Sequence, residues 1–427
     1  MQTPAPDPWP APLARAPLSA TVELPGSKSV TNRALVLAAL ADGTSVVRRP
    51  LRSRDTELMA AALRGLGVDV SDGEDGAWVV DGSAGAPVVR QRDLDVGNAG
   101  TCARFLPPVA ALSVGEVRLD GDARVRERPL GPLLVALRQL GADLDGVDAL
   151  PVVIRGTGGV RGGSVELDAS ESSQLVSGLL LSAPRFAEGV TVHHRGGVLP
   201  SAPHLAMTVS SLRASGAQVD DSEPGRWTVA PDALLPRDAV VEPDLSTAAA
   251  YLAAPLVAGG SVTIAGWPRD TVQPGAVLPE LLEAMGGRVS RTDDAVTVSG
   301  GDGLHGLTAD LSDVAELTTV LAALAALADS PSRFTGVAHI RLHETDRLAA
   351  LAKELNGLGG DVEELPDGLV IRPRRLTGGV MDSYADHRVA MAWAVLGLGV
   401  PGVEIRDVAT TRKTVPDFVG SWTTMLG

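Results

Sequence analysis

Apolar and polar positions repeat along this chain with a period of 70 to 75 residues. The segment 63–67 is Leu-Arg-Gly-Leu-Gly, and related segments that end in glycine stand at 137–141, 212–216, 282–286 and 355–359. Each is typical of the last turn of a helix, with the glycine in the left-handed conformation that residues with a Cβ avoid. Two short apolar runs around a polar turn follow each glycine and predict a pair of strands.

The sixth copy of this pattern is due where the chain ends, at residues 425–427, so no strand pair can follow it. Residues 16–24 have the composition of a strand and stand before the first repeat. We therefore expect residues 16–24 to supply a missing strand and to close the repeat circularly.

A second series of helices is predicted at the same period, each with a polar start and an almost wholly apolar body. Helices that are apolar all round are buried, so these should form the interior of each domain. We expect their polar starts to converge on one face, where two domains meet. The starts are expected near Ser27, Asn98, Ser170, Asp244, Asp310 and Asp382.

The repeating unit is therefore strand–helix–strand–helix–strand–strand (βαβαββ), and it occurs six times. A chain of 427 residues favours two domains, which gives three repeats in each of two similar α/β domains. Residues 26–243 are predicted to form domain 1 and residues 244–427 domain 2. Residues 1–25 are predicted to contribute a strand that completes domain 2.

The amino-acid composition excludes some classes of protein. The net charge of −15 argues against a nucleic-acid-binding protein, although a local basic cleft can still bind small anions. The single cysteine, Cys102, excludes an intrachain disulfide and fits an intracellular protein. The Pro/Ala-rich segment 1–20 does not have the form of a signal peptide, and no apolar run reaches transmembrane length.

The segment 24–33 predicts an anion site. A Pro-Gly turn leads into a helix that Ser27 can cap, where backbone N–H groups and the positive end of the helix dipole attract negative charge. Lys28 and Asn32, and likewise Ser29 and Arg33, are four residues apart, so each pair shares a helix face. The cations, hydroxyls and amide at this helix start together favour an anion.

Lysine is scarce in this sequence, which contains three lysines among 37 basic residues. A chain that uses arginine almost everywhere and retains Lys28 and Lys413 indicates sites that need a compact ammonium group. Lys353 lies in an ordinary helical pattern and is expected at the surface. Other polar segments at helix starts or in equivalent loops are 97–101, 124–129, 171–174, 200–204, 314–316, 343–347, 384–388 and 412–413.

Four of these motifs together resemble the enolpyruvyl transferase family, and within it the EPSP synthases. They are Pro-Gly-Ser-Lys-Ser at 25–29 with Asn32 and Arg33, Gly-Asn-Ala-Gly-Thr at 97–101, Glu-Thr-Asp-Arg at 344–347 and Asp-His-Arg at 386–388. The resemblance covers the chain from about residue 16. It implies two inside-out α/β domains of three repeats each, in agreement with the repeat count.

The resemblance also implies a reaction, in which phosphoenolpyruvate and shikimate 3-phosphate give 5-enolpyruvylshikimate 3-phosphate and phosphate by addition and elimination. It implies a cytoplasmic, monomeric enzyme of the shikimate pathway, which leads to chorismate and the aromatic amino acids. No cofactor, metal, nucleic acid or membrane takes part. Such chemistry needs charge neutralisation, positioning and proton transfer.

Site residues follow from the resemblance motif by motif. Shikimate 3-phosphate would be held by Lys28, Ser29, Arg33, Ser172, Ser173, Gln174, Ser201, Glu316, His339 and His343. Phosphoenolpyruvate would be held by Lys28, Gly100, Arg128, Gln174, Arg347, Arg388 and Lys413. The catalytic groups would be Glu316, His343, Glu344, Lys28 and Lys413, with Glu316 taking the proton of the 5-hydroxyl and Glu344 a candidate for proton handling at carbon 3.

Four positions depart from the form seen in many members of the family. Glu316 stands where Asp is common, His343 where Lys is common, His339 where Asn is common and Phe105 where Pro is common. The first two leave open whether Glu316 or His343 moves a given proton. Phe105 leaves the response to the inhibitor glyphosate open, because its helix shapes the glyphosate-sensitive part of the site in relatives.

The sequence gives less support to three other hypotheses, namely a sister transferase, a non-catalytic relative and a metal site. The sister transferase acting on UDP-N-acetylglucosamine uses a mobile-loop cysteine, and residues 120–130 contain none. A non-catalytic anion-binding relative would be expected to lose Glu316, Arg388 or Lys413. His339 and His343 could ligate a metal, but no third ligand stands at a suitable spacing. Cys102 is expected to be a packing residue.

Overall fold

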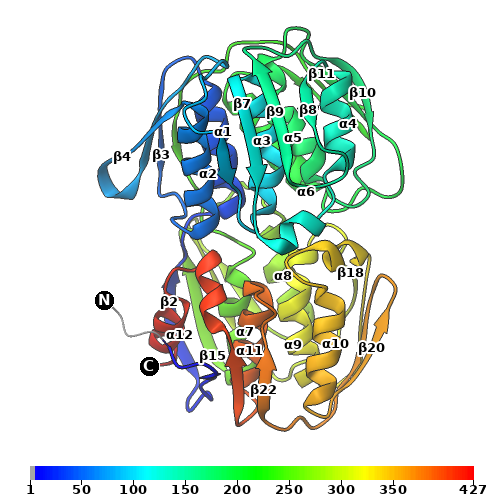
Figure 1. Cartoon of the computed structure of the whole chain (residues 1–427). Helices are drawn as coiled ribbons and strands as arrows, with labels where there is room; N and C mark the ends of the chain where they lie inside the picture. The colour runs from blue at the N-terminus through cyan, green and yellow to red at the C-terminus, as the bar shows by residue number, and fades with distance from the viewer. Residues whose placement is uncertain (1–4) are drawn as a thin grey trace. The chain divides into compact units, whose positions relative to one another are not determined.

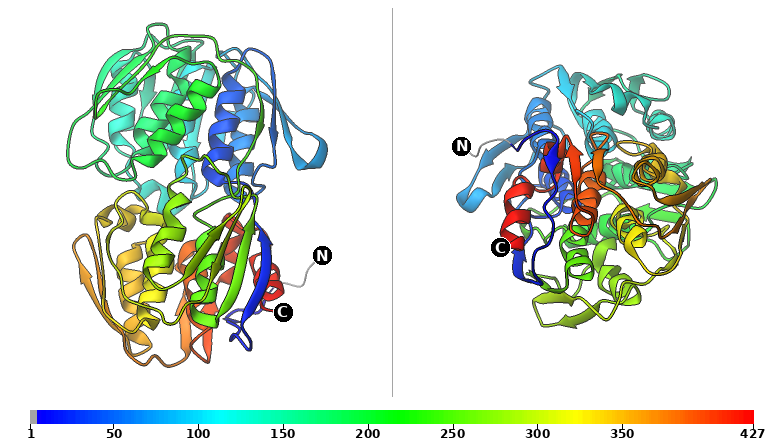
Figure 2. Two further views of the ribbon diagram at one scale, coloured as in Figure 1. Left: turned by 180° about the vertical axis from the view of Figure 1, so that it is seen from behind. Right: turned by 90° about the horizontal axis from the view of Figure 1, so that it is seen from below.

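The computed structural model describes residues 5–427, and the chain divides into two compact units. One is Gly26–Val241, and the other combines the residues up to Pro25 with Glu242–Gly427. Each unit has a hydrophobic core of its own. In each unit the helices run side by side and the sheets lie along their outside (Figures 1 and 2).

The unit Gly26–Val241 contains three four-stranded sheets, one for each repeat, with the orders β14-β3-β5-β4, β6-β7-β9-β8 and β10-β11-β13-β12. In each, the first two strands are parallel and the remaining pairs antiparallel. The strands are β3 (Thr44–Arg48), β4 (Asp69–Asp72), β5 (Trp78–Asp81), β6 (Asp93–Asp95), β7 (Val114–Asp120), β8 (Asp143–Asp145), β9 (Val152–Thr157), β10 (Gly163–Leu167), β11 (Val190–His194), β12 (Val219–Asp220), β13 (Arg226–Val229) and β14 (Asp238–Val240).

The helices of this unit alternate between buried and half-exposed. All thirteen residues of α3 are buried, as its apolar sequence predicts. The helices are α1 (Lys28–Leu40), α2 (Arg54–Leu66), α3 (Gly100–Leu112), α4 (Gly131–Gln139), α5 (Gln174–Ser182) and α6 (Pro203–Ala214), with 3-10 turns η1 (Glu74–Gly76), η2 (Ala123–Glu127) and η3 (Ala183–Arg185).

The other unit repeats this plan, with sheet orders β16-β17-β15-β2, β18-β19-β21-β20 and β1-β23-β22. Its strands are β1 (Trp9–Pro10), β2 (Leu18–Glu23), β15 (Gly260–Ala265), β16 (Arg288–Arg291), β17 (Ala295–Ser299), β18 (Thr308–Asp310), β19 (Ser332–Thr335), β20 (Asp361–Leu365), β21 (Gly368–Arg372), β22 (Gly379–Asp382) and β23 (Val403–Arg406). Its helices are α7 (Ala248–Ala258), α8 (Leu278–Ala284), α9 (Thr318–Leu327), α10 (Arg347–Gly357), α11 (His387–Gly397) and α12 (Phe418–Leu426), with 3-10 turns η4 (Pro274–Val277), η5 (Ala315–Leu317), η6 (Ala338–Leu342) and η7 (Val408–Lys413).

Two strands each join a sheet whose other strands are distant in sequence. Strand β2 precedes α1 in sequence, but it pairs in parallel with β15 over six residues. Strand β14 precedes α7, but it pairs in parallel with β3. Leu18–Glu23 therefore supply a strand to the unit that contains Glu242–Gly427, as expected of residues 16–24, but they join the sheet of β15, and the sheet of the last repeat is completed by β1 instead.

The five repeated glycines have the predicted left-handed backbone. Their φ angles lie between 90° and 106°. At Gly67 a Cβ would stand 2.0 Å from the carbonyl oxygen of Val88, so close backbone packing reinforces the requirement for glycine there. The glycines are Gly67, Gly141, Gly216, Gly286 and Gly359.

The predicted starts of the buried helices are early by up to eight residues. Asp310 and Asp382 do not begin helices but end strands β18 and β22, and each carboxylate accepts the N–H two residues on. This local turn competes with the helix, so α9 begins at Thr318 and α11 at His387. The loops left between strand and helix carry candidate site residues.

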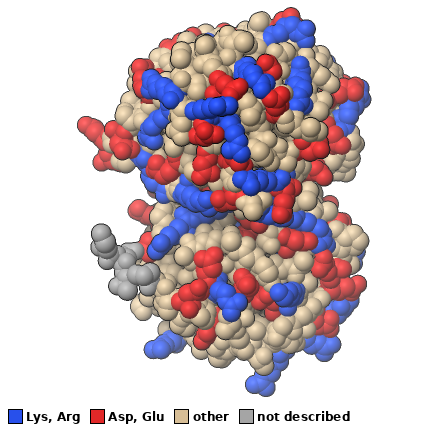
Figure 3. Space-filling view, viewed as in Figure 1, with Lys and Arg blue, Asp and Glu red and all other residues tan. Residues whose placement is uncertain are grey.

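Acidic and basic side chains are interspersed over the visible surface of each unit (Figure 3). Many form exposed ion pairs, such as Arg48 with Asp238 and Arg372 with Glu363, which contribute little to stability. Within residues 5–427, no helix has both the length and the apolar character that crossing a bilayer requires.

Candidate active site

In the unit Gly26–Val241 the first cluster centres on Arg33, whose exposure is 1%. Its Nε donates to Thr208 Oγ1 at 2.8 Å, Nη2 donates to the His204 carbonyl at 2.9 Å, and Nη1 donates to the Ser29 carbonyl at 3.0 Å. Burial lowers the pKa of Arg33 to about 9. A buried guanidinium held by neutral acceptors favours an anionic ligand, because the anion would offset the lost hydration.

Lys28 is the first residue of α1, five residues before Arg33. Its Nζ lies 3.5 Å from the carboxylate of Asp55, which α2 buries to 4% exposure. Ser27 occupies the N-cap position but makes no side-chain capping bond, contrary to the cap that the sequence suggested. The hydroxyl of Ser27 therefore does not satisfy the first N–H groups of α1.

The start of α3 is tied to α1 and to Arg128. Asn32 Nδ2 donates to Thr101 Oγ1 at 2.6 Å, which fixes the two helix starts together. Arg128 Nη1 donates to the Asn98 carbonyl at 3.3 Å. A Cβ at Gly100 would stand 2.5 Å from Arg128 Nη2, so the absence of a side chain at Gly100 leaves room for that guanidinium.

Serines and an amide surround the start of α5. Ser172 Oγ accepts the Gln174 N–H at 3.3 Å, and Ser173 Oγ donates to the Ser201 carbonyl at 3.4 Å. Ser201 has a φ of 53°, a rare conformation for a serine. The side-chain oxygen of Gln174 is buried and has no hydrogen-bond partner within residues 5–427. The predicted site residues of this unit therefore make contacts between the N-terminal ends of α1, α3, α5 and α6.

In the other unit, Arg347 begins α10 and is 1% exposed. Its Nε and Nη2 donate to the two oxygens of Asp386 at 2.8 and 3.2 Å and form a bidentate ion pair. Burial acts to lower the pKa of Arg347, but the carboxylates of Asp386, Glu344 and Glu316 outweigh it and raise the pKa above its ordinary value. Arg347 therefore remains a cation.

Asp386 has a second role, because its carboxylate also accepts the N–H groups of Arg388 and Val389 and caps α11. The chain reaches it through Tyr384 and Ala385, whose φ angles are 54° and 53°. Two consecutive non-glycine residues in this region store strain, which is found mainly where function requires it. The side chain of Arg388 begins at the same helix end.

Lys413 and Arg347 share one carboxylate. Lys413 Nζ donates to Glu344 Oε1 at 2.8 Å, and Arg347 Nη2 donates to Glu344 Oε2 at 3.1 Å. The side chains of Lys413 and Glu344 are only 12% and 9% exposed. The arrangement is a chain of alternating charges, from Lys413 through Glu344 and Arg347 to Asp386.

His343 accepts a hydrogen bond in this structure. Its Nδ1 lies 3.1 Å from Arg347 Nη1, and a guanidinium can only donate. In this contact Nδ1 of His343 is therefore the acceptor. The ring of His339 packs edge-on against that of His343, with centroids 5.8 Å apart.

Glu316 lies in η5, directly before α9, and its charge acts on Arg347. The structure therefore brings Glu316, His339, His343, Glu344, Arg347 and Lys413 into one cluster. Three groups that contact the predicted site residues were not expected from the sequence. They are the carboxylates of Asp55 and Asp386 and the hydroxyl of Thr208. Asp55 and Thr208 stand in ordinary helical patterns, and nothing local in the sequence distinguishes them.

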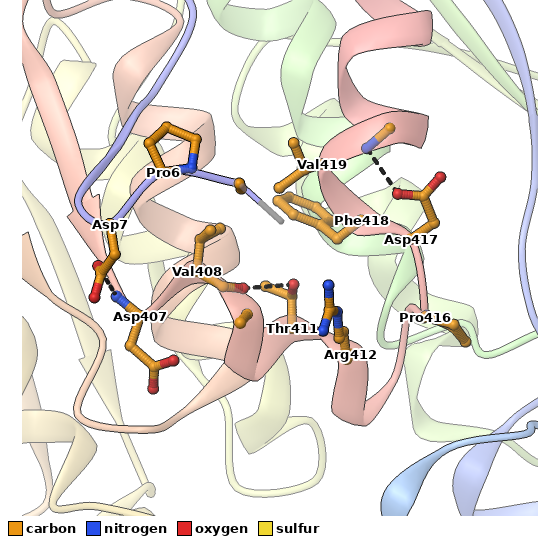
Figure 4. Close-up of a pocket in the computed structure, with 13 residues that line it drawn as sticks. Pro6, Asp7, Asp407, Val408, Thr411, Arg412, Pro416, Asp417, Phe418 and Val419 are labelled. Carbon is orange, nitrogen blue, oxygen red and sulfur yellow. Dashed lines mark hydrogen bonds between the residues drawn. The ribbon is translucent and has the colours of Figure 1, made fainter. Parts of the chain in front are cut away.

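A separate pocket of about 430 Å³ lies between the N-terminal segment, η7 and the start of α12 (Figure 4). Asp7, Asp407, Arg412 and Phe418 are among its lining residues. None of the predicted site residues lines it. Cys102 is fully buried and donates from Sγ to the Asp55 carbonyl, as expected of a packing residue.

The comparisons with known proteins extend over nearly the whole chain. The family model described as EPSP synthase (3-phosphoshikimate 1-carboxyvinyltransferase) matches residues 13–422. A 3-phosphoshikimate 1-carboxyvinyltransferase from Mycobacterium ulcerans (strain Agy99) is 53% identical over 426 residues, which are 98% of each chain.

Solved structures show the same fold. An EPSP synthase from Acinetobacter baumannii aligns with a TM-score of 0.81 at 24% identity, covering 97% of each chain. The enolpyruvyl transferase NikO from Streptomyces tendae aligns with a TM-score of 0.75 at 20% identity, covering 97% of this chain and 96% of that one.

Proposed function

Because this chain belongs to the EPSP synthase family, we propose that it transfers the enolpyruvyl group of phosphoenolpyruvate to the 5-hydroxyl of shikimate 3-phosphate and releases phosphate. The chain is a transferase. The observation that carries this function is the 53% identity to a 3-phosphoshikimate 1-carboxyvinyltransferase over 98% of both chains. The transfer to UDP-N-acetylglucosamine is not favoured.

Shikimate 3-phosphate binds chiefly to the unit Gly26–Val241 in this proposal. The buried guanidinium of Arg33 and the ammonium of Lys28 supply positive charge for its anionic groups. The unpartnered amide oxygen of Gln174 supplies an acceptor for a hydroxyl. The ligand set of this unit is Lys28, Ser29, Arg33, Ser172, Ser173, Gln174 and Ser201. Glu316, His339 and His343 of the other unit complete the set.

Phosphoenolpyruvate binds to arginine and lysine side chains in this proposal. Arg347 and Arg388 stand at the starts of α10 and α11, where the helix dipoles also favour an anion. Arg128 is placed beside Gly100, and Lys413 is a compact ammonium. The ligand set is Lys28, Gly100, Arg128, Gln174, Arg347, Arg388 and Lys413.

The chemistry is an addition followed by an elimination. Carbon 3 of phosphoenolpyruvate gains a proton while the 5-hydroxyl oxygen attacks carbon 2 and passes its proton to Glu316. The tetrahedral intermediate then loses a proton from carbon 3, the bond from carbon 2 to the phosphate oxygen breaks, and phosphate leaves with the proton that Glu316 received. The cations lower the barrier by neutralising charge on phosphate and carboxylate.

The contacts of Glu344 support Lys413 as the first proton donor. Both Glu344 oxygens accept bonds, from Lys413 and from Arg347, which supports Glu344 in the role of an acceptor. The ammonium of Lys413 holds protons next to it and is the donor to carbon 3. Glu344 orients Lys413. During elimination Glu344 can pass the proton released from carbon 3 back to Lys413.

A coupled phosphate-release assay tests the function. We expect phosphate release with phosphoenolpyruvate and shikimate 3-phosphate together, and none when either is omitted. Lys413→Met and Glu316→Gln should each lower the turnover by at least about a hundredfold, since general acid–base groups contribute that much. Lys353→Met is the matched control, since the Lys353 side chain is 72% exposed. Release with UDP-N-acetylglucosamine in place of shikimate 3-phosphate would contradict the assignment.

We also propose that the protein acts as a cytoplasmic monomer. The single buried cysteine supports a reducing compartment. Sedimentation velocity with and without both substrates would give the mass of one chain, and a stable dimer would contradict this.

A further inference from the structure

We propose that Phe105 is a positioning residue that keeps Arg33 charged and in place through the face of its ring, and so sets the affinity for shikimate 3-phosphate. The Cζ atom of Arg33 lies over the ring of Phe105, 5.3 Å from the centroid. Both side chains are buried, with exposures of 1% and 0%. The inference rests on the proposed function of Arg33 as a ligand of that substrate.

Arg33 lacks the acidic partners of Arg347, although the two arginines are equally buried at 1% exposure. Arg347 pairs with Asp386 and Glu344, whereas the partners of Arg33 within residues 5–427 are a hydroxyl and two carbonyls. Burial lowers the pKa of Arg33, and no nearby carboxylate counteracts that effect. The cation therefore depends on neutral groups for its stabilisation.

The hydrogen bonds and the ring act on different parts of the guanidinium. The N–H groups lie in the plane of the guanidinium, so the bonds to Thr208, His204 and Ser29 hold its edges. The Cζ atom of Arg33 lies over the ring of Phe105, and the negative potential of an aromatic face attracts a cation. The attraction is stronger for a desolvated cation, and Arg33 is only 1% exposed.

The ring itself has little freedom to move. Phe105 lies on α3, which packs closely against α5 at Gly178. A Cβ at Gly178 would stand 2.1 Å from the Arg104 carbonyl oxygen and 3.4 Å from Phe105 Cδ1. Since Thr101 also ties α3 to Asn32 of α1, the ring is fixed relative to the helix that carries Arg33.

Removing the ring should therefore weaken one substrate selectively. Phe105→Leu retains an apolar side chain but lacks the aromatic face. We expect KM for shikimate 3-phosphate to rise roughly three- to thirtyfold, from the range of cation–π energies. The turnover and KM for phosphoenolpyruvate should stay within about twofold, because Arg33 is not among the phosphoenolpyruvate ligands proposed above.

A fluorination series separates the ring face from packing. Phe105 is replaced by mono-, di- and trifluorophenylalanine, which withdraw electron density from the face at nearly constant shape. KM for shikimate 3-phosphate, and its Kd by calorimetry without phosphoenolpyruvate, should rise stepwise with each fluorine. The same series at Phe186, a buried phenylalanine of the same unit, is the matched control.

Two results would overturn the inference. If Phe105→Leu raises KM for shikimate 3-phosphate but fluorination of Phe105 leaves that KM unchanged, Phe105 acts only by filling space. If KM falls with fluorination, the ring opposes the anion. Arg33→Gln tests the underlying assignment separately, because unchanged binding of shikimate 3-phosphate in that variant would remove Arg33 from the ligand set whatever the ring does.

Discussion

At the scale of single residues, burial separates Lys413, which is proposed to act in the site, from the surface residue Lys353. Lys413 is 12% exposed and bound to Glu344, whereas Lys353 is 72% exposed and donates to the Tyr384 hydroxyl. A composition dominated by arginine retains lysine at both, so scarcity alone does not separate them.

Lys413→Arg should lower the turnover at least tenfold, which corresponds to about 1.4 kcal/mol of transition-state stabilisation. The guanidinium is larger than an ammonium and loses its proton far less readily, so it neither fits the contact with Glu344 nor donates to carbon 3. Steady-state kinetics of this variant and of Lys353→Arg, which should match the wild type, test the argument. Equal tolerance at both positions would refute it.

The Nδ1 atom of His343 accepts from Arg347 Nη1, and a proton on Nδ1 would remove this hydrogen bond. In His343→Gln the amide oxygen can accept the same bond. We therefore expect the alkaline limb of the pH profile of turnover to coincide in His343→Gln and wild type, with His339→Gln as the control. A shift of the limb by one pH unit or more would indicate that His343 titrates during catalysis.

At the scale of elements, the start of α3 shows how a missing side chain shapes a site. A Cβ at Gly100 would stand 2.5 Å from Nη2 of Arg128 and 3.0 Å from Nη1 of Arg104. These atoms are the ends of flexible side chains, so they can move, but Arg128 would leave its present position. The backbone of α3 itself would be unaffected.

Gly100→Ala should therefore raise KM for phosphoenolpyruvate about tenfold or more, as expected when one charge-assisted contact is lost. The unfolding midpoint in urea should change little, because alanine suits a helix better than glycine. Gly357→Ala is a matched control, since a Cβ there would meet no atom within 4 Å. An unchanged KM would indicate that Arg128 does not contact phosphoenolpyruvate.

At the scale of the whole molecule, strands with partners distant in sequence decide how the chain can be shortened. All six residues of β2 pair with β15, which is otherwise the edge of its sheet, and β1 pairs with β23. A deletion of residues 1–24 removes both strands from the unit that contains Glu242–Gly427. The unit Gly26–Val241 loses no strand.

Hydrogen exchange should report this difference. In the deletion variant, protection of residues 260–265 should fall at least about tenfold, because β15 becomes an unprotected edge. Peptides from Gly26–Val241 should keep their protection. A deletion of residues 1–4 is the control, and uniform loss of protection along the chain would show that the units do not unfold separately.

Much of this architecture follows from local sequence. The repeat of about 73 residues, the left-handed glycines and the apolar inner helices depend on short-range chemistry, and all three are confirmed. Sequence also indicated Lys28, Arg33, Arg347 and Lys413 as candidate ligands, because the motifs that contain them match a family.

Tertiary structure alone decided which charges meet. Asp310 and Asp382 look like helix starts in sequence, but each closes a turn at the end of a strand, because strand pairing fixes the backbone just before it. Some partners of the buried arginines are local in sequence, but Thr208 for Arg33 and Asp386 for Arg347 come from distant segments. Sequence determined the repeated unit and its cations, and only packing between helices decided that Arg347 meets Asp386 while Arg33 meets the ring of Phe105.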